Sequence, residues 1–176
     1  MSDSTQSVIQ AMLAYRCPRY DQLPAITLYN DQVTDALNYY LSPLWPGEDH
    51  AVTAAMINNY VKQRVIAPPV KKRYDREQLA RLYCTCLLKH VFTISEIRAL
   101  MEIQSRSYPF PVAYDYFCVE LEKALCSTFS TRDFSAPPSA TKVTPESELV
   151  RSSALSIAHR LFTERFLQLY DLNDQE

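Results

Sequence analysis

Glycine occurs only once in this chain of 176 residues, at Gly47, and that scarcity restricts the fold more than any other feature. Tight β-hairpins depend on residues that adopt positive φ, and glycine is the commonest of these. The chain is instead rich in Leu, Ala, Gln, Glu and Arg, which favour helices, and proline marks the loops. The sequence therefore predicts a mainly α fold. The glycine-rich phosphate-binding loops of the GxGxxG and GxxxxGK types are absent as well, which excludes nucleotide hydrolysis by those loops.

The length and composition are those of a folded protein with one domain or two small ones, since 47% of the residues are hydrophobic. The first residues, MSDSTQSVIQ, lack the basic and apolar regions of a signal peptide. No segment reaches the roughly 20 apolar residues that a membrane span requires. Five scattered cysteines, an odd number, are typical of a reducing compartment. We therefore expect a cytoplasmic protein with no membrane partner.

Residue types that bind metals or perform catalysis form no known motif in this chain. Cys84 and Cys86 fall in a helical segment, where their side chains point about 200° apart, so the spacing predicts core thiols rather than zinc ligands. The histidines lie far apart and belong to no metalloprotease, catalytic-triad or paired-carboxylate pattern; they are His50, His90 and His159. We therefore expect neither an enzyme nor a cofactor.

Charge is distributed unevenly along the chain, although the formal net charge is only -2. Residues 51–106 contain ten of the 18 basic residues and four acidic ones, a net charge of +6, while the remainder carries -8. An acidic protein with one basic segment can attract a polyanion to one face and repel it elsewhere. The alternative explanation is a solvated helical face without a ligand.

Capping residues and prolines delimit two helices in the first half of the chain. Asn30 or Asp31 is expected to cap a helix that Pro43 ends. Thr53 is expected to cap a second helix, which the Pro-Pro step beginning at Pro68 stops. The following residues, APPVKKRY, are too few for more than an extended loop or a small two-stranded wing.

Four further helical segments are predicted in the rest of the chain. Asp75 caps one helix, and Thr93 opens the next with the capping box T-x-x-E. An aromatic helical segment, YPFPVAYDYFCVELEKALCSTF, follows it. After a Ser/Thr/Pro-rich loop or linker at about residues 130–144, the step from Thr144 to Pro145 predicts the start of a long C-terminal helix.

Four features of the middle segment are shared with one type of DNA-binding domain. Tyr60 falls at a helix tyrosine of that domain, residues 65–68 stand for its Leu-Leu-x-Pro step, and Arg64 replaces the glycine that ends its helix. Residues 73–82 follow its wing exit and next helix, and residues 92–97 match its Phe-Ser-Leu-x-Glu-Ile turn. The segment thus resembles the MerR type of winged helix-turn-helix.

A second resemblance covers more of the chain. LPAITLYNDQV followed by MINNYVKQRVIAPPVKKRY is similar to the bacterial family catalogued as domain of unknown function 1836, over about residues 22–105. Together the two resemblances imply three regions. Residues 1–20 are an N-terminal arm, residues 21–106 a MerR-like winged helix-turn-helix with a short wing, and residues 107–176 a C-terminal helical region.

The MerR resemblance implies that a recognition helix at about residues 53–64 enters the major groove of double-stranded DNA. Amide side chains on this helix can both donate and accept, as the edge of adenine requires. Cations at its end and in the wing, residues 71–73, are expected to bind phosphates or to follow the adjacent minor groove. The candidate DNA-binding residues are Thr53, Asn58, Asn59, Lys62, Gln63, Arg64, Lys71, Lys72 and Arg73.

These observations lead us to expect a DNA-binding transcriptional regulator. The alternative is a non-catalytic protein-interaction or dimerisation module on the same winged-helix scaffold, because a fold does not fix a function. The aromatic C-terminal region suits a homodimer interface or the binding of a small-molecule or protein effector. A plain helical core is an equal alternative for that region.

Overall fold

The computed structural model describes residues 3–45, 51–132, 139 and 141–173, and this part of the chain is mainly helical, as expected. The predicted loop around Gly47, His50 and part of the predicted linker lie outside the described residues. The described α-helices are α1 (Asp3–Ala14), α2 (Asn30–Leu41), α3 (Ala54–Lys62), α4 (Arg76–Leu88), α5 (Ile94–Ser107), α6 (Phe110–Cys126) and α7 (Pro145–Asn173). Two short turns accompany them, η1 (Tyr20–Gln22) and the π-helical η3 (Ser127–Thr131), which continues α6.

Side chains at the predicted positions cap three of these helices. Thr53, Asp75 and Thr93 each accept a hydrogen bond from the backbone N–H three residues further on. α2 is different, because it begins at Asn30 and its N-cap is Tyr29. The Oε1 atom of Gln32 accepts the Tyr29 N–H at 2.9 Å, so a side chain inside the helix satisfies this end. The prediction that Asn30 or Asp31 caps α2 is therefore wrong.

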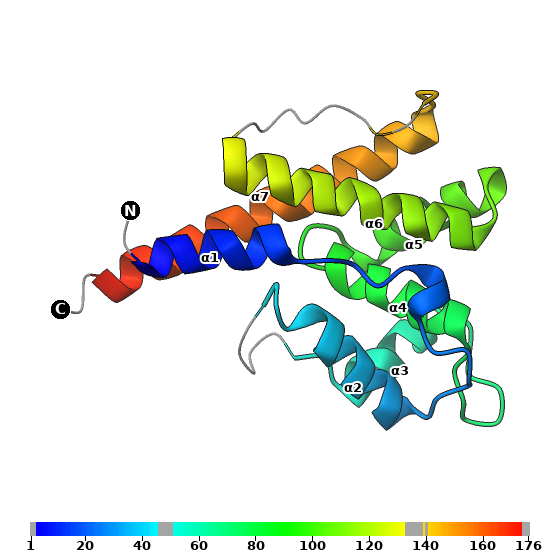
Figure 1. Ribbon diagram of the computed structural model, residues 1–176. Coiled ribbons are helices and arrows are strands. Elements are labelled where there is room, and N and C mark those ends of the chain that lie inside the picture. Colours follow the sequence, from blue (N-terminus) through cyan, green and yellow to red (C-terminus); the bar gives the residue numbers. More distant parts are fainter. Residues whose placement is uncertain (1–2, 46–50, 133–138, 140, 174–176) are drawn as a thin grey trace.

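α4 lies in the middle of the molecule (Figure 1). α2 packs against one side of it, with α3 beside α2, and α6 and α7 pack against another side. α1 runs along α6 and α7, so the N-terminal segment lies with the C-terminal helices. α2, α3 and the loop that joins α3 to α4 therefore form the end of the molecule opposite α6 and α7 (Figure 1).

Burial of α4 extends around the whole helix. Every residue from Gln78 to Leu88 is buried except Arg81, which is half-buried. In the sequence, the apolar residues of this helix from Leu79 to Leu87 recur at helical spacing and so indicate one apolar stripe, but Ala80 and Thr85 are also completely buried. A helix that is apolar on all sides is typical of the centre of a packed core. α4 is thus the element around which the other helices assemble.

Two short polar networks fix the path of the chain between α2 and α3. The Asn38 side chain donates to the Val52 carbonyl at 3.0 Å and accepts the Val52 N–H at 2.7 Å, as a neighbouring strand would. At the end of α2, the Trp45 Nε1–H donates to Glu164 of α7 at 3.0 Å. The Trp45 ring also stacks on His90, with 4.0 Å between the ring centroids. These contacts hold both described ends of the connection to α3.

None of the described helices combines the length and the apolar composition needed to cross a lipid bilayer.

Buried tyrosine hydroxyls connect the segment that follows α1 with α2, α4 and α6. Tyr15 donates to the Tyr40 carbonyl at 3.1 Å, and its hydroxyl lies 2.5 Å from that of Tyr83. Tyr114 donates to the Pro18 carbonyl at 2.8 Å. Burial raises the pKa of all three phenols, those of Tyr15, Tyr83 and Tyr114, well above the usual 10.0. The folded protein therefore keeps these groups neutral.

We expect the protein to lose stability in alkali because of these phenols. Their pKa is raised in the folded state, so their contribution is complete below about pH 10 and decreases as the pH rises further, where the unfolded chain ionises first. Denaturant unfolding at several pH values between about 8 and 11 measures this. Tyrosinate absorbance should develop for the buried phenols together with the loss of helical circular dichroism. Complete ionisation in a protein that keeps its helical signal contradicts the prediction.

Candidate nucleic-acid interface

All nine predicted site residues are exposed in the structure. Thr53 is the N-cap of α3, and Asn58, Asn59 and Lys62 lie on the helix. Gln63 is its C-cap, Arg64 follows it, and the three remaining residues form a turn before α4 at 71–73. The helix predicted at about residues 53–64 is observed as Ala54–Lys62, two residues shorter at its C-terminal end.

The exposed face of α3 carries amides and a cation. Ile57 and Tyr60 point into the core, while Asn58 and Asn59 are exposed and each lies beside Lys62, which follows them by four and three residues. The Asn58 Oδ1 atom accepts a hydrogen bond from Asn30 Nδ2 of α2 at 3.1 Å. No such bond engages Asn59 within the described part of the chain, so its amide is free to donate and accept together.

The end of α3 has the backbone geometry of a glycine cap, although glycine is absent. The Val65 N–H donates to the Tyr60 carbonyl and the Arg64 N–H to the Val61 carbonyl, each at 3.0 Å, which is the Schellman arrangement. This arrangement requires a left-handed residue after the C-cap, and Arg64 has φ 57°. The substitution of glycine by Arg64 therefore leaves the cap intact and places a cation on it at a cost in backbone strain.

The turn that follows α3 also contains left-handed cations. Val70 and Arg73 exchange two backbone hydrogen bonds, at 3.0 and 2.9 Å, and so close a two-residue turn. Its central residues, Lys71 and Lys72, have φ 49° and 64°, as a type I′ turn requires. Asn-Gly is the usual sequence of such turns, because a lysine at positive φ is strained. The two lysines therefore lie at the tip of a tight, defined turn rather than in an extended loop.

None of the five predicted phosphate-binding cations forms an ion pair within the described residues. The ion pairs found there involve Arg19, Arg81, Arg106 and Arg160, and not Lys62, Arg64, Lys71, Lys72 or Arg73. Positive charge on this surface is therefore not neutralised by the protein. An anionic ligand could interact with these cations without first displacing a carboxylate.

The first turn of α2 connects the two parts of this surface. Asn30 bonds Asn58 of α3, and the adjacent Tyr29 bonds Arg73 of the turn, whose Nη2 atom donates to the Tyr29 hydroxyl at 2.8 Å. The Arg73 guanidinium also lies 4.6 Å from the centre of the Tyr29 ring. Reciprocal backbone bonds between Leu28 and Tyr74 hold the two segments together. Tyr29 and Asn30 thus belong to the surface, although no sequence pattern indicated a binding role for either of them.

Gln78, a buried residue of α4, fixes the loop that carries the turn. Its Nε2 atom donates to the carbonyls of Ala67 and Pro68, at 2.9 and 3.2 Å, and its Oε1 atom accepts the Asp75 N–H at 2.9 Å. All the main hydrogen-bonding positions of this amide are therefore used. The loop between α3 and the turn is attached to the central helix at this point.

Cys84 and Cys86 of α4 are buried, and burial raises the pKa of their thiols, to about 12 for Cys86 and higher for Cys84. They are core thiols, as predicted. Within the described residues no three His, Cys, Asp or Glu side chains are grouped so as to hold a metal ion.

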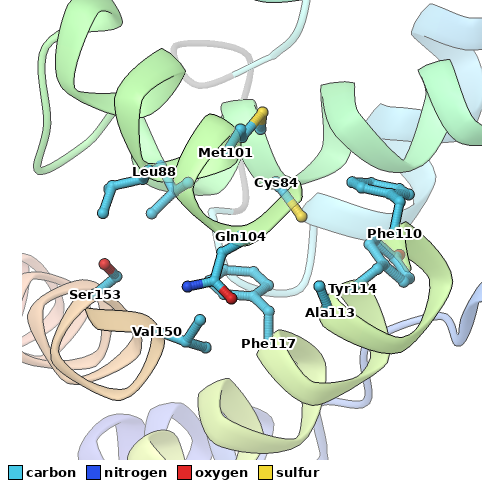
Figure 2. Close-up of a pocket in the computed structure, with 11 residues that line it drawn as sticks. Cys84, Leu88, Met101, Gln104, Phe110, Ala113, Tyr114, Phe117, Val150 and Ser153 are labelled. Carbon is cyan, nitrogen blue, oxygen red and sulfur yellow. The ribbon is translucent and has the colours of Figure 1, made fainter. Parts of the chain in front are cut away.

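A small apolar cavity lies where α4, α5, α6 and α7 meet, and Figure 2 shows Leu88, Met101, Phe117 and Val150 around it. Its volume is about 60 Å³. An engineered protein cavity that binds benzene measures about 150 Å³, so this one has the size of a packing gap. Tyr114 and Phe117 are buried nearby, while Phe134, another aromatic residue of the region, lies outside the described part. The described aromatic residues of α6 therefore serve mainly as core.

Residues 18–117 match the family described as Domain of unknown function (DUF1836), and they make up more than half of the chain. The protein therefore belongs to this family. The match includes α2, α3, the turn at 70–73 and α4, and so the whole candidate interface. The comparisons with curated proteins and with solved structures gave no match.

Glycine at the strained positions is expected to stabilise the protein. Arg64→Gly should raise the free energy of unfolding by about 0.5–1 kcal/mol, because removing the Cβ relieves the left-handed strain. Lys71→Asn/Lys72→Gly should raise it by about 1–2 kcal/mol, because asparagine tolerates the left-handed conformation and glycine has no Cβ. Lys62→Gly is the control, since Lys62 is helical and the same replacement should lower stability by about 1 kcal/mol. Denaturant midpoints at constant m-value measure all three. A loss of stability in Arg64→Gly contradicts the assignment of Arg64 as the left-handed cap.

Proposed function

We propose that this protein binds double-stranded DNA and regulates transcription, with α3 in the major groove and the turn at 70–73 acting as a short wing on the backbone. The observation that carries the proposal is the set of unpaired, exposed cations next to the amide face of α3. In this proposal α2 and α3 are the two helices of a winged helix-turn-helix of the MerR kind.

The arrangement of the surface supports the major-groove assignment. α3 is a short helix at the end of the molecule opposite α6 and α7, so a duplex can approach it without meeting the larger part of the protein (Figure 1). On its outward side Asn59 and Lys62 are three residues apart and lie side by side. An amide suited to reading a base is thus next to a cation suited to binding a phosphate. Five of the ten basic residues of 51–106 lie on this surface, so the local positive charge attracts the duplex to this end.

Backbone strain in the same residues also supports the proposal. The four described non-glycine residues with positive φ are all basic, and three of them lie on this surface: Arg64, Lys71 and Lys72. Strained backbone is commonest where function requires a particular side chain. We infer that the binding free energy contributed by these cations offsets the folding free energy that is lost to backbone strain at the same positions.

Removing the charge from the turn should weaken DNA binding while the turn itself is kept. Lys71→Asn/Lys72→Gly retains the type I′ geometry and removes two cations, so binding to genomic fragments should become weaker on all sequences. The slope of log K against log salt should decrease by about 1.8, since each lost phosphate contact contributes about 0.9. A titration of labelled fragments over a salt series measures both effects.

The control removes the same amount of charge from the other side of the molecule. Lys123→Gln/Lys142→Gln changes α6 and the segment before α7, and it should leave both affinity and salt slope close to those of the unmodified protein. Equal losses in the two double variants would show that binding depends on net charge alone and would overturn the assignment of the turn. Absence of binding by the unmodified protein at low salt would overturn the function itself and favour a protein-interaction module.

Base preference is expected to depend on Asn59. Asn59→Ala should reduce the discrimination between the preferred site and its single-base variants by about 1–3 kcal/mol, because a bidentate amide contact is lost. Asn58→Ala should have a smaller effect, since Asn58 Oδ1 is already engaged by Asn30. Competition between the selected fragment and its variants measures the difference. A larger effect at Asn58 than at Asn59 contradicts this order.

A further inference from the structure

A groove of about 590 Å³ lies between the segment before α2 and the turn at 70–73. One wall contains Thr27 and Tyr29, and the other contains Lys71 and Arg73; Asp75 and Gln78 of the α4 start also line it. Lys71 and Arg73 are among the residues predicted from the sequence, whereas Thr27 and Tyr29 are not. The groove is therefore lined by two cations, Lys71 and Arg73, and by the aromatic hydroxyl of Tyr29.

Arg73 is held within this groove by two different contacts with one side chain. Its Nη2 atom donates to the Tyr29 hydroxyl at 2.8 Å, and its guanidinium carbon lies 4.6 Å from the ring centre. Arginine has five N–H donors, so most of them remain available to a ligand. A guanidinium already fixed in place loses less conformational freedom when it binds an oxyanion, which increases affinity.

The acidic residue of the groove is committed elsewhere. Asp75 Oδ1 accepts the Gln78 N–H at 2.8 Å as the N-cap of α4, and Asp75 forms no ion pair with Arg73 or Lys71 in the described structure. Gln78 donates to two loop carbonyls and so does not reach toward the groove as a donor. The balance of formal charge on the lining residues is therefore +1, with the cations on the exposed rim.

From this geometry we propose that the groove is a subsite for one phosphodiester group, bound by the guanidinium of Arg73 and the ammonium of Lys71. Tyr29 is a positioning residue, which holds the Arg73 guanidinium in the orientation that the phosphate requires. The inference rests on the proposed DNA binding and adds to it a residue of α2 that orients a residue of the wing.

The test compares variants of the positioning contact in DNA binding. Arg73→Gln should weaken binding to genomic fragments roughly tenfold and reduce the salt slope by about 0.9, the value for one phosphate. Tyr29→Phe keeps the ring and removes the hydroxyl, and it should weaken binding roughly three- to tenfold. In the Arg73→Gln background the same change should have no further effect, because the group that Tyr29 positions is absent.

Tyr39→Phe is the matched control, since Tyr39 is a tyrosine of the same helix, is 77% exposed and does not line the groove. It should bind DNA as the unmodified protein does. Tyr29→Phe binding equal to that of Tyr39→Phe would overturn the positioning role. So would a Tyr29→Phe effect of the same size in both backgrounds, because that shows action independent of Arg73.

A second measurement separates this inference from the proposed function. Inorganic phosphate is titrated into the protein without DNA while the side-chain Nε–Hε resonances of arginine are followed by NMR. A saturable shift of the Arg73 resonance, reduced in Tyr29→Phe, supports the subsite even if no duplex binds, and then the natural ligand is a free phosphate group. DNA binding with neither a phosphate-dependent shift of Arg73 nor an effect of Arg73→Gln overturns the subsite and leaves the proposed function standing.

Discussion

The enclosure of α4 by other helices is the constraint on which the rest of the structure depends. A helix buried on all sides must be covered by separate elements, and here α2 covers one side and α6 and α7 cover others. The chain before and after α4 is therefore divided between two layers. α2, α3 and the turn lie at one end of the molecule, while α1, α6 and α7 lie at the other. The cations at the first end form no ion pairs within the described residues, so their charge remains available on that surface.

At three basic residues of this surface, the backbone conformation favours a residue type other than the one present. Arg64 ends α3 and Lys71 and Lys72 form a tight turn, three positions at which glycine or asparagine would be more stable. Selection for stability alone would remove these strained residues. Their positive charge, unpaired and exposed, is the property that glycine would not supply. The proposed contact with a DNA backbone gives that charge a use.

Much of the fold could be predicted from short-range signals. Thr53, Asp75 and Thr93 cap helices as expected, because capping depends on residues only three positions apart. The candidate site was predicted only in part, since contacts between distant residues leave no such signal. Tyr29 and Arg73 are 44 positions apart, and their bond depends on the pairing of the two segments. The wrong cap of α2 has a different reason, because the contact is local: Gln32, three residues after the N-cap Tyr29, satisfies the Tyr29 N–H, and no Ser, Thr, Asp or Asn occupies the N-cap.

The sequence by itself determined that the chain is mainly helical and where most helices begin, because composition, capping residues and prolines act locally. It also determined that positive charge is concentrated in residues 51–106. Only the tertiary structure decided which faces of those helices are covered. The sequence indicates one apolar stripe on α4, but the whole helix is buried because α6 and α7, which come later in the chain, also pack against it. It likewise decided that Tyr29 and Asn30 join α3 and the turn, since a surface made of distant segments exists only once the core has brought them together.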